Sequence, residues 1–180
     1  ILTFRPKLQE WTELSQFTVL YDSASDEYTA RAFNSKVTGH EHVMLVIVTA
    51  DDNVFGSYNG KHVPTKTEAK VTKTGYFVDC DEDFFICSLK NPANTPPQIY
   101  VSHKHSESLL IFPNSNPEKG IVGTVCAFWL YEDHAFISKM FHSNFQTPEG
   151  VVAENTALTG DFYPTYFQVK QLLALEWSNN

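Results

Sequence analysis

The chain has few cysteines, no long hydrophobic run and little positive charge. Its most apolar window, at 43–50, has the length of a strand, whereas a membrane-spanning helix needs about 20 apolar residues. The net charge is −8, and proteins that bind nucleic acid usually present a basic face to the phosphates. We therefore expect neither membrane insertion nor nucleic-acid binding by this domain.

Only three cysteines occur in 180 residues, and none of them forms a CxxC pair. This sparse, odd set fits a reducing compartment better than a secreted disulfide scaffold, so we expect an intracellular, cytoplasmic protein. The chain opens on Ile1 without the features of a signal peptide, and we expect a domain excised from a longer chain. Its length and its 42% hydrophobic content predict a single domain over residues 1–180.

The order of apolar segments predicts two helices followed by many short strands. Pro6 is placed for the first turn of one helix, and residues 28–35 form the second, with N-cap candidates at 22–26 and an end at Gly39. Residues 113–120 are expected to form a loop. The predicted strands lie at 17–21, 43–50, 54–58, 75–78, 83–89, 99–101, 109–112, 125–131, 134–138 and 166–177. This order predicts an α+β fold, a two-sheet antiparallel β-sandwich flanked by two or more short helices.

Several short motifs occur in an order that resembles the TLDc domain of the oxidation-resistance proteins. The sequence FGSY at 55–58 matches the family's FG-x-Y hairpin, and FFICSL at 84–89 matches its FLFSL strand. The segment 156–177 matches the family's ending, a T-x-x-L turn followed by F-x-v-x-x-lE-w. The residues that carry these matches are Phe55, Gly56, Tyr58, Gly75, Phe84, Glu176 and Trp177. The likeness spans essentially the whole chain.

The chain resembles a divergent member of that family. The family's HG-x-S element is replaced at 25–29 by a sequence without glycine, and only Gly120 and Gly123 precede the strand matching its Lwld motif. The resemblance implies a non-catalytic protein-interaction domain linked to protection against oxidative stress. Several family members resemble regulators of the vacuolar-type proton ATPase, so subunits of that enzyme are the expected partners. The resemblance supplies no catalytic residue, metal ligand or cofactor.

A thiol-based antioxidant enzyme is one alternative. Its nucleophile would be a cysteine with a low pKa. Cys87 and Cys126 lie in predicted apolar strands, where burial raises the pKa of a thiol. Cys80 stands between Asp79 and Asp81, whose negative charges also disfavour the thiolate. The three thiols therefore favour a structural interpretation over a catalytic one.

A metal-dependent antioxidant enzyme is a second alternative. His40 with His42, and His103 with His105, would each place two imidazoles on one face of an extended segment, and together they would suit zinc or copper. The two pairs are about sixty residues apart with no predicted pairing, so exposed turn histidines are the simpler expectation. Residues 79–83 resemble the start of an EF-hand loop, but the required Gly and Glu are missing and a solvated hairpin turn is expected.

A third alternative is a regulatory domain of a transcription-related protein, in which other parts of the protein contact DNA. Within the motif residues, Phe55 and Tyr58 are expected to pack, and Gly56 to allow a bulge or a close backbone approach. Glu176 lies between two core-type residues, so we expect it either to point outward by alternation or to be held by a partner.

Overall fold

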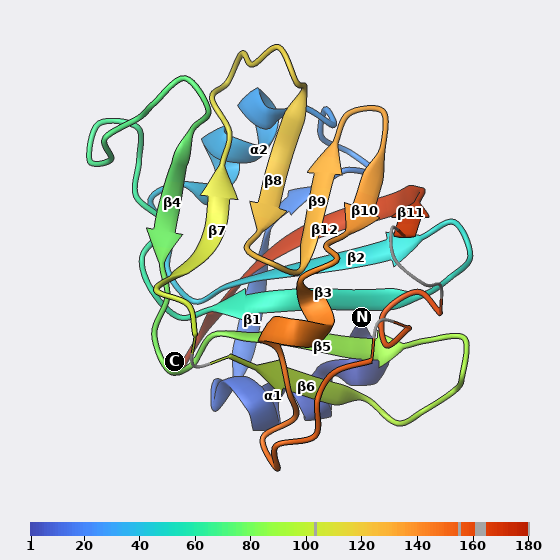
Figure 1. Cartoon of the computed structure of the whole chain (residues 1–180). Coiled ribbons are helices and arrows are strands. Elements are labelled where there is room, and N and C mark those ends of the chain that lie inside the picture. The colour runs from blue at the N-terminus through green and yellow to red at the C-terminus, as the bar shows by residue number, and fades with distance from the viewer. Residues whose placement is uncertain (103, 155, 161–164, 180) are drawn as a thin grey trace.

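Two antiparallel sheets make up most of the computed structural model, which describes residues 1–102, 104–154, 156–160 and 165–179. Within these residues the first sheet has the strand order β1-β12-β2-β3-β5-β6, and the second has the order β11-β10-β9-β8-β7-β4 (Figure 1). The helices are η1 (Leu2–Phe4), α1 (Arg5–Thr12), α2 (Ala30–Val37) and α3 (Phe141–Asn144). The strands are β1 (Gln16–Asp22), β2 (Val43–Thr49), β3 (Val54–Asn59), β4 (Tyr76–Asp79), β5 (Phe85–Lys90), β6 (Gln98–Val101), β7 (Glu107–Ile111), β8 (Gly120–Thr124), β9 (Phe128–Tyr131), β10 (Ala135–Ile137), β11 (Thr165–Phe167) and β12 (Val169–Ser178). The predicted α+β sandwich with short flanking helices is confirmed.

The main core lies between the two sheets. Phe55 of β3 contacts Phe128 of β9 and Phe167 of β11, with 5.4 and 5.3 Å between ring centroids, so one side chain joins strands of both sheets. In Figure 1 the strands of the second sheet stand nearly upright across the more horizontal β2, β3 and β5. Such steep crossing is the orthogonal mode of sheet packing.

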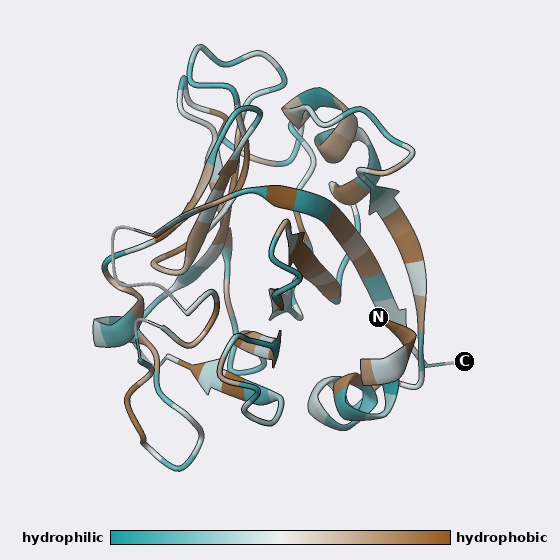
Figure 2. Cartoon of the chain, turned by 90° about the vertical axis from the view of Figure 1, so that its right-hand side faces the viewer, coloured by the Kyte–Doolittle hydropathy of each residue, from teal (hydrophilic) through white to brown (hydrophobic). Residues whose placement is uncertain are grey.

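A second core lies on the other face of the first sheet, under α1. Leu8 of α1 packs there with Met44 and Val46 of β2 and with Trp177 of β12. Because β2 faces the main core on one side and α1 on the other, it is buried along nearly its whole length. This explains why the run at 43–50, predicted as a strand, is apolar almost without interruption. Figure 2 shows hydrophobic residues concentrated on the strands and hydrophilic ones on the loops.

Helix α2 closes one end of the sandwich. Its residue Phe33 lies in the main core against Tyr21, with 5.4 Å between ring centroids. The N-cap is Thr29, whose side chain accepts a hydrogen bond of 3.3 Å from the backbone N–H of Ala32. The predicted cap at 22–26 is wrong because those side chains hold the preceding turn, where Asp26 accepts from the backbone N–H of Asp22.

The predicted strand at 125–131 begins three residues too early, because β9 covers only Phe128–Tyr131 and residues 125–127 form a turn. Strands β8 and β9 pair as a hairpin, and the turn between them places Cys126 in the left-handed region with a φ of 58°. Cys126 therefore lies in a turn and not in an apolar strand. The predicted loop at 113–120 is too long by one residue, because Gly120 begins β8. The turn between β8 and β9 was not predicted because it contains apolar residues in place of the usual Gly, Pro, Asn or Asp.

Two other segments change sheets where the sequence suggested continuity. The predicted strand at 166–177 is broken at Gln168, and its halves are β11 of the second sheet and β12 of the first. The acidic segment at 79–83 is not a hairpin turn, because β4 pairs with β7 whereas β5 pairs with β3 and β6. Both segments are corners at which the chain passes from one layer to the other.

Candidate functional site

A cavity of about 760 Å³ lies between α2 and the segment that leads into β4. We call it the α2 cleft. Helix α2 forms one wall, the turn around Thr65–Thr67 forms the opposite wall, and the chain after β7 closes the end. Residues that line it include Arg31, Asn34, Lys66, Val71, Tyr76 and Phe112. The cleft thus joins parts of the chain that are far apart in sequence.

Asn34 fixes the base of the α2 cleft. Its side-chain nitrogen Nδ2 donates hydrogen bonds of 2.8 Å to the carbonyl oxygen of Phe112 and 2.9 Å to Oδ1 of Asn114. Since the carbonyl of Phe112 can only accept, the amide must turn its nitrogen towards β7 and its oxygen away from it. That oxygen is buried and has no hydrogen-bond partner within the described residues.

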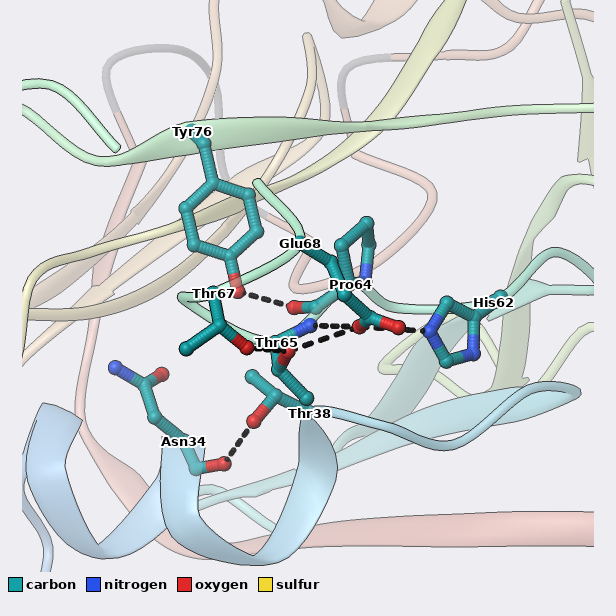
Figure 3. A network of polar contacts seen from close by, with 8 residues as sticks. All are labelled: Asn34, Thr38, His62, Pro64, Thr65, Thr67, Glu68 and Tyr76. Atoms are coloured by element: carbon teal, nitrogen blue, oxygen red, sulfur yellow. Dashed lines mark hydrogen bonds and ion pairs between the residues drawn. The ribbon is translucent and has the colours of Figure 1, made fainter. Parts of the chain in front are cut away.

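A compact network of polar contacts holds the opposite wall (Figure 3). Glu68 accepts hydrogen bonds of 2.7 Å from the backbone N–H of Thr65, 2.9 Å from its hydroxyl, and 3.1 Å from Nε2 of His62. These bonds, the Thr65 backbone bond foremost, lower the pKa of Glu68 to about 2. Tyr76 of β4 donates from its hydroxyl to the carbonyl oxygen of Pro64, and burial raises the pKa of Tyr76 to about 12. The turn is therefore anchored to the second sheet.

The α2 cleft carries positive charge although the chain as a whole is acidic. The segment 61–75, which supplies one wall, contains four lysines, of which Lys66 lines the cleft, and only one glutamate, Glu68, which is engaged within its own turn. Arg31 and Lys66 are exposed and line the cleft from its two walls. Neither forms an ion pair or hydrogen bond with another described residue, so both cations are available to a ligand.

A second polar group lies where the segment before β2 crosses the end of β12. Nδ1 of His40 donates a hydrogen bond of 3.0 Å to Oε1 of Glu176, and Nδ1 of His42 lies 2.8 Å from the hydroxyl oxygen of Tyr58. We call these four residues the histidine corner. The backbone N–H of Trp177 also donates to the carbonyl oxygen of His42, which joins the corner to β12.

His40, His42 and His105 are not the exposed turn histidines that the sequence predicts. His42 has a φ of 53°, so its segment is not extended, and both His40 and His42 are half-buried with partners of their own. His105 is half-buried too, and burial lowers its pKa. His103 lies outside the described residues. In the described part of the chain, no three His, Cys, Asp or Glu side chains gather to hold a metal ion, and this includes the acidic segment at 79–83.

The seven motif residues divide into packing positions and the histidine corner. Phe55 and Phe84 are core side chains, and a Cβ at Gly56 would lie 1.9 Å from the carbonyl oxygen of Leu45. Gly75 has a φ of 109°, and a Cβ there would lie 2.1 Å from the carbonyl oxygen of Ile111. The other three, Tyr58, Glu176 and Trp177, meet at or beside the corner.

None of the motif residues lines the α2 cleft. Asn34 was not predicted as a site residue, since a single Asn in a helix carries no sequence signal of its own. The lysine-rich stretch at 61–73 was the one available hint, because it stands out in a chain of net charge −8.

All three cysteines are free thiols. Burial raises the pKa of Cys87 to about 12. The pKa of Cys80 is also raised, first by burial and then by the charge of Asp81, and burial raises that of Cys126. None of them has the electropositive surroundings that activate a nucleophilic cysteine.

Comparison of the chain with known proteins identifies its family, and the lengths of its helices bear on membrane insertion. The longest helices, α1 and α2, have eight residues each, and no helix in the described part of the chain has the length and apolar character needed to span a bilayer. A search of curated proteins gave no significant match. The family model of the TLDc domain matches residues 2–171, which is nearly the whole chain. The chain therefore belongs to the TLDc domain family.

Proposed function

We propose that this TLDc domain is a non-catalytic interaction domain that binds subunits of the vacuolar-type proton ATPase and contributes to protection against oxidative stress. The observation that carries the proposal is the family match over residues 2–171. The raised pKa of all three thiols supports it, because direct reduction of peroxide by cysteine requires a readily formed thiolate. Protection then comes through a partner. Three free cysteines suit a cytoplasmic location for that partnership.

The surface we assign to the partner is centred on Glu41, which is exposed beside the histidine corner. Two shallow hollows meet at this residue. One, of about 360 Å³, is also lined by Glu176 and Trp177, and the other, of about 550 Å³, is also lined by Asp79 and Asp81. Four carboxylates and one lysine, Lys61, thus line the two adjoining hollows, and this excess of negative charge is complementary to a basic segment of a partner.

A pull-down from a native cell lysate tests the proposal, with this domain as bait and the abundance of proton-ATPase subunits as readout. We expect specific enrichment of those subunits, reduced at least about fivefold by Glu41→Lys because the substitution places like charges in the interface. Glu176→Gln removes a charge while keeping an acceptor for His40, and it should weaken binding less. Glu132→Lys is the matched control, because Glu132 is exposed in the turn between β9 and β10, away from the corner.

Equal enrichment with all three variants would contradict the assignment of the surface. Absence of proton-ATPase subunits from the eluate of a folded bait would contradict the choice of partner. A circular dichroism spectrum of each variant, unchanged from that of the parent chain, establishes that the baits are folded.

A further inference from the structure

The α2 cleft is separate from the proposed partner surface at the histidine corner. We propose that this cleft binds a small amphipathic carboxylic acid, one that joins a ring-sized apolar body to an N–H or O–H donor. The cleft volume of about 760 Å³ lies within the range of about 300–1,000 Å³ typical of small-molecule sites. Its occupancy is independent of proton-ATPase binding.

The walls of the cleft are suited to an apolar ring. Tyr76 and Pro113 line the interior and are half-buried, whereas Phe112, which also lines it, is only 3% exposed because its ring packs against Trp129 and Tyr131. Val71 also lines the cleft, and its aliphatic side chain is 42% exposed. A flat apolar ligand would bury the exposed parts of Val71, Tyr76 and Pro113, and this burial would be the main source of affinity.

The base of the cleft offers a hydrogen-bond acceptor. Asn34 is 9% exposed, and its Oδ1 has no partner among the described residues. Figure 3 shows the Asn34 amide facing Thr67 across the cleft. Thr38 does not satisfy this oxygen, because its hydroxyl donates to the backbone carbonyl of Asn34, at 2.8 Å. Buried acceptors are nearly always paired in proteins, so a ligand that brings an N–H or O–H to this point completes the site.

The rim supplies the charge that selects an acid. Arg31 on α2 and Lys66 on the opposite turn line the cleft from two sides. The planar guanidinium group of arginine can donate two parallel hydrogen bonds to a carboxylate, and the lysine adds a second, flexible cation. No carboxylate of the described residues pairs with either cation, so a bound acid would not have to displace one.

The cleft is formed before the ligand arrives. Asn34 ties α2 to the chain after β7, and the bonds of Glu68 and Tyr76 hold the turn that forms the other wall. A preformed site avoids the entropy cost of ordering a loop, which favours binding of a small ligand.

The test is an NMR titration of the whole chain, labelled with nitrogen-15, with three compounds of similar size. Indole-3-acetate carries a ring, a carboxylate and an N–H donor. Naphthalene-1-acetate keeps the ring and the carboxylate but lacks the donor, and tryptamine keeps the indole but carries a positive charge. We expect indole-3-acetate to bind with a dissociation constant on the order of 1 mM or tighter, shifting the signals of Asn34 and Lys66. Naphthalene-1-acetate should bind about fivefold to tenfold more weakly, and tryptamine should not bind.

Three variants locate the site without disturbing its core. Lys66→Glu should weaken binding of indole-3-acetate at least about tenfold, because it reverses the charge at the rim. Lys70→Glu is the matched control, since Lys70 is exposed in the same loop but does not line the cleft. Ser35→Trp places a large ring on the exposed face of α2 at the cleft and should abolish binding.

The proposal is overturned if indole-3-acetate produces no saturable shifts in cleft residues of the folded parent chain. It is also overturned if Lys66→Glu and Lys70→Glu bind alike, or if naphthalene-1-acetate binds as tightly as indole-3-acetate. A failure of proton-ATPase binding would leave these results untouched, because the cleft and the histidine corner have no residue in common.

Discussion

Nδ2 of Asn34 donates a hydrogen bond of 2.8 Å to the carbonyl oxygen of Phe112, and this bond joins helix α2 to the end of β7 across 78 residues of sequence. The same side chain sets the base of the α2 cleft. It therefore links the stability of the fold to the shape of this cleft, and this link is open to measurement.

Replacing Asn34 with alanine should lower the free energy of unfolding by about 1–3 kcal/mol, because the carbonyl of Phe112 loses its buried partner. Urea denaturation followed by fluorescence measures the change. Ser35→Ala is the control, because Ser35 is exposed and bonds only within its own helix, and it should change stability by about 0.5 kcal/mol or less. Equal stability of Asn34→Ala and the parent chain would show that the bond to Phe112 contributes nothing.

Gly56→Ala should destabilise the domain by about 3 kcal/mol or more, and it is expected to prevent folding at physiological temperature. A Cβ at this position would lie 1.9 Å from the carbonyl oxygen of Leu45 in the neighbouring strand β2. Thermal unfolding monitored by circular dichroism measures the effect. The control is Ser57→Ala in the same strand, which removes only a hydroxyl contact to Thr124 and should cost about 1 kcal/mol. Similar melting temperatures for the two variants would contradict the close approach of β2 and β3.

The turn at Thr65–Glu68 should lose its order in acid. The pKa of Glu68 is lowered from 4.5 to about 2 by the hydrogen bonds it accepts, first from the Thr65 backbone and then from His62. Since the folded-state pKa lies below the unfolded value, this contribution to stability is complete above pH 4.5 and is lost as the pH falls towards 2.

Carbon-13 NMR of the Glu68 carboxyl group measures its pKa, and hydrogen exchange at the Thr65 amide measures the order of the turn. Glu68→Gln should raise the exchange rate at Thr65 at neutral pH. Glu82→Gln, at an exposed carboxylate before β5, should leave that rate unchanged. A pKa of 4.5 or above for Glu68 would show that the carboxylate does not hold the turn.

The thiols should be slow to react in the folded chain. Because burial raises the pKa of Cys87 to about 12, this residue should not react with a disulfide reagent until the chain unfolds. Cys80 and Cys126 are half-buried, and with a raised pKa each should react more slowly at pH 8 than free cysteine. Counting modified thiols with time, with and without denaturant, checks this. Rapid consumption of hydrogen peroxide that Cys80→Ser abolishes would instead support an antioxidant enzyme.

Local signals in the sequence predicted much of the fold. The β2–β3 hairpin follows from an apolar run, the polar turn at 51–53 and a second strand, and Pro6 marks the first turn of α1. The turn at Cys126 and the break at Gln168 carry no such signal. Cys126 is held in the left-handed region by the pairing of β8 with β9, and Gln168 is where one strand leaves the second sheet for the first. Tertiary packing decides both.

Neither the histidine corner nor the α2 cleft could be predicted from local sequence patterns, because each is formed by segments that are far apart in the chain. His40 and Glu176 are 136 residues apart and meet only because the end of β12 lies beside the segment before β2. Glu176 was predicted either to point outward or to be held by a partner, and His40 was not predicted to be that partner. The α2 cleft forms where a helix approaches a turn some thirty residues later in the chain, and no motif spacing encodes that approach.

The most direct test of the proposed function is the binding of this purified domain to purified vacuolar-type proton ATPase, with ATP hydrolysis and release of the peripheral sector followed in the same samples. The proposal predicts saturable binding that changes one of these activities and that is weakened by Glu41→Lys but not by Glu132→Lys. Absence of binding by the folded domain at about 100 μM, a concentration at which even weak specific complexes form, would contradict it.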